Sequence, residues 1–191
     1  PPLLSSFHDT FPKIHLKLQT GDASQALPQV LDALADISVA PLPNNPPDQL
    51  AFRRLVETPL VFVIPKVDCA VRNLFLHDDI DFSQVPMVLP ESELARRRID
   101  VWFQAKGIDP LIYALVAGNE AIIAMVSLGV GAGVLPRLVA ESSPLKEQIE
   151  VVPINPPLEP YCLCLCVLKR RLASPVVRAF WEQTVFSTDY A

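Results

Sequence analysis

The sequence predicts an α/β fold in which sheets of mainly parallel strands are covered by helices on both faces. Segments with the periodicity of strands alternate with segments that have the periodicity of helices along most of the chain. Half of the 191 residues are apolar and 19% are charged, so the chain can bury a sizeable core. At roughly 150 residues per domain, this length corresponds to one domain or to two small interleaved lobes.

Strands are predicted where apolar residues alternate with polar ones, or form short runs between turn residues. The first is 13–19, in which Ile14, Leu16 and Leu18 share one face and the residues between them are polar. The other expected strands are 37–40, 50–56, 60–64, 86–89, 111–116, 130–135, 150–154 and 161–168.

Helices are predicted where apolar residues recur every three or four positions and where capping residues stand at the ends. Ser92 and Asn119 are expected N-caps. Gly107 and Gly129 are expected to end the helices that precede them. The expected helices are 24–35, 93–106, 120–128, a short segment that begins at Pro136, and 175–185.

The charge and hydropathy of the chain exclude several classes of protein. With 16 basic and 21 acidic residues, the net charge is −5, which argues against this chain binding a nucleic-acid backbone by itself. No apolar run reaches the ~20 residues of a membrane span. The first residues also lack the basic start of a signal peptide. We therefore expect neither membrane insertion nor export.

Three of the four cysteines alternate with apolar residues in one predicted strand. Cys162, Cys164 and Cys166 would share one strand face, and a metal there would need a fourth ligand from Cys69 or His77. No zinc-binding spacing is present, so these thiols are interpreted as small apolar residues of a strand buried on both faces. We expect no metal and no cofactor. Unpaired buried thiols also indicate a reducing compartment, the cytoplasm.

Two patterns that could suggest enzymatic chemistry are better explained by structure. The run Gly129-x-Gly131-x-Gly133 ends a helix and enters a strand, whereas a dinucleotide-binding fingerprint follows a strand and opens a helix. We interpret it as a helix stop followed by close backbone packing. None of the three histidines shares a motif with a nucleophile, and no G-x-S-x-G is present, so we expect no catalytic residues.

The run Arg96-Arg97-Arg98 lies near the start of the helix that follows Pro90. Three consecutive helical positions span about 200° of arc, so the three guanidinium groups cannot share one direction. They form either a solvated helix face or, at Arg96 or Arg97, the cation that faces a bound anion near the helix N-terminus. Similar strand-to-helix junctions occur at 20–23 and 118–120, where helix N-termini offer unpaired N–H groups.

Several segments occur in an informative order along nearly the whole chain. They are Leu3-Leu4-x-x-Phe7-x-x-x-Phe11-Pro12, Thr20-Gly21-Asp22, Ala35-Asp36-Ile37-Ser38-Val39-Ala40, Trp102-Phe103-x-x-x-Gly107, 126–136, and Ser174-Pro175 followed by Phe180-Trp181. In this order and spacing the chain resembles the effector-binding domain of LysR-type transcriptional regulators.

The resemblance implies a two-lobed, periplasmic-binding-protein-like (type II) α/β fold, each lobe a mixed, mainly parallel sheet flanked by helices. Lobe I would comprise residues 1–65 and 167–191, and lobe II residues 66–166. The winged helix-turn-helix of the family is absent from this sequence, so we expect DNA binding only through that domain. The candidate ligand-binding residues stand at the three strand-to-helix junctions and are Gly21, Asp22, Ala95, Arg96, Arg97, Gly118, Asn119 and Glu120.

Within the family, 19–23, 96–103, 112–114 and 118–121 are most similar to activators of the acetohydroxy acid isomeroreductase gene of isoleucine–valine biosynthesis. This similarity implies a small carboxylate inducer, 2-acetolactate or 2-aceto-2-hydroxybutyrate, and a role in transcription rather than catalysis. It also implies a homodimer or homotetramer. The alternative is a solute-binding protein of a transport system, which shares the architecture. The clustered thiols and the lack of a visible signal peptide argue against that alternative.

Overall fold

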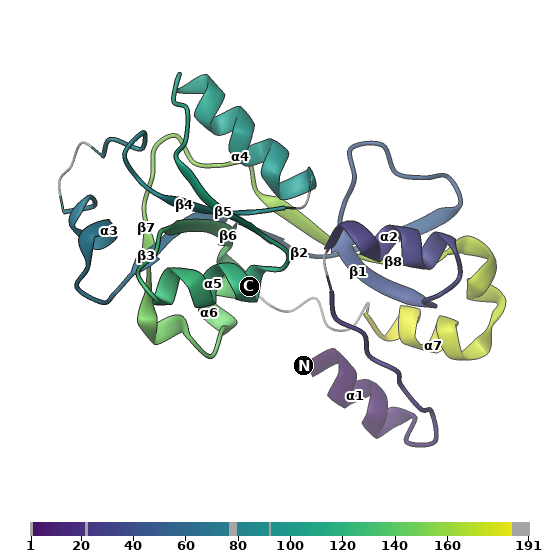
Figure 1. Cartoon of the computed structure of the whole chain (residues 1–191). Coiled ribbons are helices and arrows are strands. Elements are labelled where there is room, and N and C mark those ends of the chain that lie inside the picture. Colours follow the sequence, from purple (N-terminus) through teal and green to yellow (C-terminus); the bar gives the residue numbers. More distant parts are fainter. Residues whose placement is uncertain (1, 22, 77–79, 92, 185–191) are drawn as a thin grey trace. The chain divides into compact units, whose positions relative to one another are not determined.

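The chain crosses twice between two structural units in the computed structural model, which describes residues 2–21, 23–76, 80–91 and 93–184 (Figure 1). The first unit comprises residues 1–57 and 162–191, and the second comprises residues 58–161. Both divisions lie earlier in the chain than the expected ones at 65/66 and 166/167. The first lies earlier because Pro59 has no N–H to donate: β2 (Leu50–Thr58) ends before it, and all of β3 (Leu60–Pro65) belongs to the second unit.

The first unit is built on a three-stranded sheet in the order β1-β8-β2. The edge strand β1 (Ile37–Pro41) runs antiparallel to the central strand β8 (Tyr161–Leu168). In the core of this unit, Val30 of α2 (Ala23–Leu31) packs with Leu50 and Leu168. The remaining helices of the unit are α1 (Pro2–Thr10), the 3-10 helix η2 (Lys169–Ala173) and α7 (Pro175–Gln183).

The predicted strand at 13–19 is wrong. Residues 14–20 form neither helix nor strand, and Leu16 and Leu18 are 51% and 72% exposed. Alternating hydrophobicity makes a segment able to pair, but a strand exists only where a neighbouring strand accepts its hydrogen bonds. In the described part of the chain, the sheet of the first unit contains only β1, β8 and β2.

The second unit holds a five-stranded mixed sheet in the order β5-β4-β6-β3-β7. Strand β4 is parallel to β5 and β6, whereas β3 is antiparallel to β6 and β7. This confirms a mixed sheet flanked by helices, but the expectation of mainly parallel strands is not met, because parallel pairs do not outnumber antiparallel ones in the described part of this sheet. Besides β3, the strands are β4 (Met87–Pro90), β5 (Ile112–Val116), β6 (Ala132–Pro136) and β7 (Ile149–Val152). The helices are α3 (Ala70–Asn73), α4 (Glu93–Ala105), α5 (Asn119–Ser127), α6 (Arg137–Ser142) and the 3-10 helix η1 (Lys146–Gln148).

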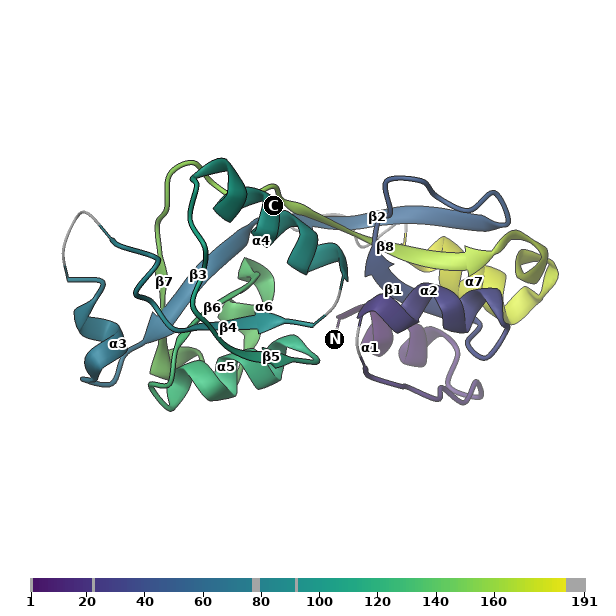
Figure 2. The same cartoon turned by 45° about the horizontal axis from the view of Figure 1, so that its top comes forward.

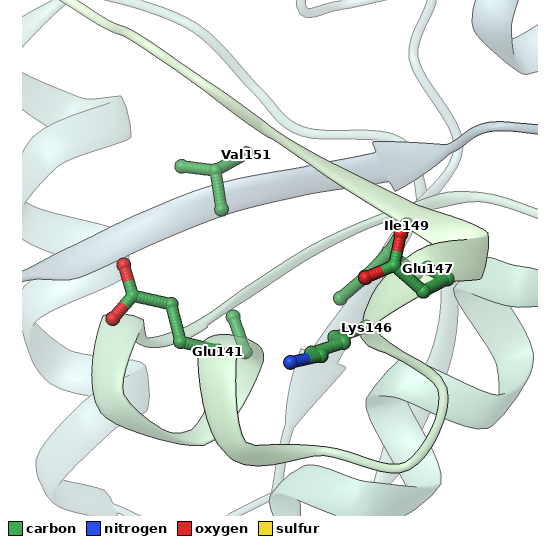
Figure 3. A pocket seen from close by; sticks show the side chains of 6 residues that line it. Glu141, Lys146, Glu147, Ile149 and Val151 are labelled. Atoms are coloured by element: carbon green, nitrogen blue, oxygen red, sulfur yellow. The ribbon is translucent and has the colours of Figure 1, made fainter.

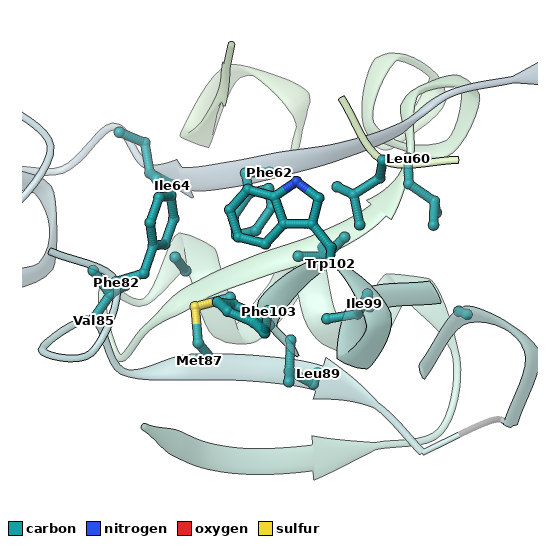
Figure 4. Close-up of a cluster of buried hydrophobic side chains, with 14 of the residues drawn as sticks. Leu60, Phe62, Ile64, Phe82, Val85, Met87, Leu89, Ile99, Trp102 and Phe103 are labelled. Carbon is teal, nitrogen blue, oxygen red and sulfur yellow. The ribbon is translucent and has the colours of Figure 1, made fainter. Parts of the chain in front are cut away.

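Each face of this sheet is covered by different helices (Figures 1 and 2). Along β3, residues 60, 62 and 64 point to the face covered by α4, and residues 61 and 63 point to the face covered by α5 and α6. On the α4 face, Phe62 packs against Phe82, Trp102 and Phe103 (Figure 4). Because β3 is buried on both faces, its sequence reads as a continuous apolar run rather than as an alternation.

The glycines that were expected to end helices do so. Gly107 follows α4 with a φ of 66°, and Gly129 follows α5 with a φ of 81°. These left-handed conformations stop a helix and favour glycine. A Cβ on Gly133 would lie 2.5 Å from Cγ2 of Ile122, so β6 and α5 approach more closely than any other residue would permit. Both parts of the structural interpretation of the glycine run are therefore confirmed.

The cysteines of β8 are also confirmed as part of a strand that becomes buried on both faces. Cys164, Leu165, Cys166 and Val167 are all buried, while Cys162 is half-buried with its sulfur 3.8 Å from that of Cys164. Burial raises the pKa of Cys164 to about 12, with a further contribution from the hydrogen bond to Cys162. Burial likewise raises the pKa of Cys166 to about 11. Both thiols therefore stay neutral at physiological pH.

We predict that alkylation by iodoacetamide at pH 8 distinguishes these thiols. Cys69 and Cys162 are half-buried and should react first, whereas Cys164 and Cys166 should react only when the chain unfolds, because the thiolate is the nucleophile. Mass spectrometry of digested protein gives the extent at each site, with labelling in urea as the control. Equal labelling of all four native cysteines would contradict the buried assignment.

The stabilisation of the fold that comes from burying these two neutral thiols is present below pH about 9. It should be lost as the pH rises through 11 and 12, the pKa values of Cys166 and Cys164 in the folded chain.

Candidate functional site

The N-termini of α4 and α5 meet at one edge of the second unit's sheet. They follow the parallel neighbours β4 and β5, whose last residues, Pro90 and Val116, lie opposite each other. The N–H of Glu91 donates to the carbonyl of Val116 at 3.0 Å and fixes the two junctions side by side. The first turns of helices carry N–H groups without intrahelical partners, which makes such an edge suited to an anion.

The turn before α5 depends on glycine. Gly118 has φ 87° and ψ 139°, a conformation essentially restricted to glycine, and it caps α5 without a side-chain hydrogen bond. Asn119 was expected to be this cap, but it is the first residue of the helix. A Cβ at Gly118 would have nothing within 4 Å, so space is open beside this backbone.

Glu120 is connected to the helix that follows. Its Oε2 accepts a hydrogen bond of 2.9 Å from the hydroxyl of Ser143, which is buried beside the end of α6. The carboxylate stands in the first turn of α5, where the helix dipole favours a negative charge. Glu120 therefore links α5 to α6, a contact for which the sequence offered no signal.

The three arginines have different surroundings. Arg96 Nε lies 2.7 Å from Oδ1 of Asp100, one turn further along α4. Arg98 donates to the carbonyl of Pro160 at 2.7 Å and pairs with Glu159 at 3.3 Å. Arg97 is exposed, and no ion pair joins it to another residue that the structure describes. The i, i+4 spacing of Arg96 and Asp100 was a usable signal for the first pair.

The predicted site residues fall into two groups. Ala95, Arg96 and Arg97 lie near the start of α4, and Gly118, Asn119 and Glu120 lie at the start of α5, so the structure brings these six to one edge of the second unit. The side chain of Ala95 is buried in the core, which leaves only its backbone for a ligand. Gly21 belongs to the first unit, before α2, and Asp22 lies outside the described residues.

Two surface hollows lie elsewhere in the described chain. One of about 250 Å³ in the second unit is bordered by Glu141, Lys146 and Glu147 (Figure 3). Two of these charges have partners, since Glu141 pairs with Arg137 and Glu147 with Lys66. The other, of about 400 Å³ in the first unit, is bordered by Gln49 and 168–170. Neither hollow includes a predicted site residue.

The described residues contain no group of three or more His, Cys, Asp or Glu side chains placed to hold a metal ion. None of the helices found in 2–21, 23–76, 80–91 and 93–184 is long and apolar enough to cross a membrane.

Two α/β units joined by two chain crossings, with helix N-termini gathered at a sheet edge, define a class of two-lobed ligand-binding domains. Comparison with known families makes this specific. The chain belongs to the LysR substrate binding domain family, which matches residues 1–185.

Curated relatives agree with this assignment. The chain is 39% identical over 182 residues to the HTH-type transcriptional activator IlvY of Haemophilus influenzae, covering 95% of this chain and 62% of the relative. It is 36% identical over 185 residues to the transcriptional regulator IlvY of Escherichia coli, with the same coverage. The chain thus spans about 62% of the length of these relatives.

The solved structures share the fold at low sequence identity. The effector-binding domain of QuiR in complex with shikimate superposes with a TM-score of 0.80 at 21% identity, covering 100% of this chain and 90% of that one. The regulatory domain of Synechocystis CcmR in complex with 2-PG gives a TM-score of 0.76 at 18% identity, covering 100% and 91%. The relatives named here are transcriptional regulators and not enzymes, and they do not favour the transport alternative.

Proposed function

We propose that this chain is the effector-binding domain of a LysR-type transcriptional activator that controls isoleucine–valine biosynthesis genes. Its similarity to IlvY activators, 36–39% identity over 95% of the chain, supports this role. The effector we propose is a small carboxylate, 2-acetolactate or 2-aceto-2-hydroxybutyrate. The observation that carries the site is the meeting of two helix N-termini beside Arg97 at the β4–β5 edge.

Each chemical group of 2-acetolactate has a candidate partner. Its carboxylate would bind Arg97 and the backbone N–H groups around Ala95. Arg96 already pairs with Asp100, whereas no ion pair joins Arg97 to another described residue, so Arg97 is the stronger candidate. The tertiary hydroxyl would donate to Glu120, and its ketone would accept from the backbone at Gly118 and Asn119.

Replacement of Arg97 by Ala should weaken binding of 2-acetolactate roughly ten- to a hundredfold, because a charge-assisted hydrogen bond contributes about 1.5–3 kcal/mol. Isothermal titration calorimetry of the chain with 2-acetolactate measures the effect. Arg137→Ala is the matched control, since that arginine is also exposed but lies on α6 and pairs with Glu141. If Arg97→Ala and Arg96→Ala both bind like the parent chain, the arginines form only a solvated surface and the proposed site is wrong.

We further propose that the chain assembles with copies of itself as a homodimer or homotetramer. Strand β5 is at an edge of its sheet, and its Tyr113 and Leu115 are 59% and 50% exposed. Val101 on α4 is exposed as well. A stable interface buries on the order of 1,600 Å², to which such an apolar edge would contribute. Sedimentation equilibrium should show a dimer or tetramer at micromolar concentration, and a monomer would contradict this proposal.

The remaining parts of the proposal concern DNA and location. The net charge of −5 supports DNA binding through a winged helix-turn-helix domain rather than through this chain. The free thiols of Cys162, Cys164 and Cys166 support a reducing compartment, the cytoplasm. Fractionation of cells that express the full-length protein tests this location, and recovery from the periplasm would instead support the transport alternative.

A further inference from the structure

The segment that connects β7 to β8, residues 153–160, contacts one side of α4. We call it the return segment, because it leads back to the chain crossing before Cys162. Arg98, Trp102 and Lys106, spaced four residues apart, each donate a hydrogen bond to a backbone carbonyl of this segment. The acceptors are the carbonyls of Pro160 at 2.7 Å, Pro156 at 2.8 Å and Asn155 at 2.9 Å, respectively.

The composition of the return segment explains why it depends on these side chains. Prolines at 153, 156, 157 and 160 have no N–H, so the segment cannot pair as a strand. Outside helices and strands, none of the backbone–backbone hydrogen bonds found in the described chain involves residues 153–160. Its carbonyls therefore find their donors in the side chains of α4.

Three further contacts involve the residues of this attachment. The ammonium group of Lys106 lies 5.0 Å from the ring centroid of Trp102, within the range of a cation–π interaction. Arg98 also pairs with Glu159 at 3.3 Å. The side chain of Leu158 is buried in the core beside Trp102. Ile154 packs against the same core, so the segment is held by two apolar side chains and by a row of polar contacts at the surface.

We propose that the return segment is a strap that α4 latches, and that it opens locally while the sheet of the second unit stays folded. Opening breaks side-chain contacts but no hydrogen bond of the sheet, so its free energy lies below that of global unfolding. The strap ends at the second chain crossing, so its contacts with α4 determine how firmly the start of β8 is held in the second unit. These contacts do not depend on which effector the chain binds.

Hydrogen exchange of the chain, measured by NMR without any effector, tests the latch. The reporting group is the indole N–H of Trp102, which donates to the carbonyl of Pro156 at 2.8 Å and exchanges when the strap opens. Lys106→Met should accelerate this exchange roughly tenfold, the equivalent of one charge-assisted hydrogen bond. Amides of β3 and β6 should be unaffected. Arg98→Met should produce the same pattern.

Lys146→Met is the matched control, because Lys146 is an exposed lysine of the same unit on η1, away from the strap. It should leave the exchange of the Trp102 indole unchanged. The proposal is overturned if neither latch variant accelerates that exchange. It is also overturned if the Trp102 indole and the sheet amides accelerate equally, since the contacts would then stabilise the whole unit. Because no effector is added, a failure to bind 2-acetolactate would leave these outcomes unchanged.

Discussion

Replacement of Phe62 by Ala should lower the free energy of unfolding of the second unit by about 3–5 kcal/mol, the range for a fully buried Phe. Phe62 is 0% exposed at the centre of β3. Its ring centroid lies 5.2 Å from that of Phe82 and 5.1 Å from that of Trp102, so truncation removes aromatic contacts and leaves a cavity between the sheet and α4 (Figure 4).

The two tryptophans allow each unit to be followed separately. Trp102 lies in the second unit and Trp181 in the first, and the chain has no others. In a Trp181→Phe background, urea unfolding monitored by fluorescence reports the environment of Trp102. Leu128→Ala is the control, since it removes an exposed apolar side chain from the same unit. Equal unfolding midpoints for Phe62→Ala and the control would show that this cluster does not stabilise the unit.

The core of the second unit was predictable because its signals are local. The apolar run of β3 marks a strand buried on both faces, and the stops at Gly107 and Gly129 need only a left-handed residue after a helix. The burial of the β8 cysteines followed in the same way from the apolar residues between them. In each case the sequence near the element contains the physical cause.

The features that sequence analysis missed depend on partners distant in the chain. The alternation of 13–19 predicts a strand, yet pairing requires a neighbour that no local pattern reveals. The position of the first crossing depended on Pro59, which separates two strands that look alike in sequence. The second division, at 161/162, lies after the first residue of β8, whereas the expected division at 166/167 lies near the end of that strand.

The candidate site was predictable only in part for the same reason. Parallel pairing of β4 with β5 brings two strand-to-helix junctions together, which alternating strands and helices suggest in advance. The partners of the arginines could not all be foreseen. Asp100 stands one helical turn from Arg96, but Arg98 contacts Glu159 and Pro160, which are far away in sequence.

The close approach of β6 to α5 gives the second large effect that we expect. Gly133→Val should lower the free energy of unfolding of the second unit by about 3 kcal/mol, the upper end for overpacking a core. The added Cβ alone would lie 2.5 Å from Cγ2 of Ile122 and 3.0 Å from Cγ2 of Val126. Both neighbours are fully buried and have stiff, β-branched side chains, so neither can move away without displacing α5.

A double-mutant cycle with Ile122→Ala tests this cause directly, using urea unfolding in the Trp181→Phe background. Ile122→Ala alone should destabilise the unit by about 2–5 kcal/mol through cavity formation. In the double variant the valine methyl groups would occupy part of that cavity, so the combined loss should be smaller than the sum of the two single losses. Gly21→Ala is the control, because a Cβ there meets nothing within 4 Å. Strict additivity would mean that Gly133 and Ile122 are not in contact and that glycine is required at 133 for another reason.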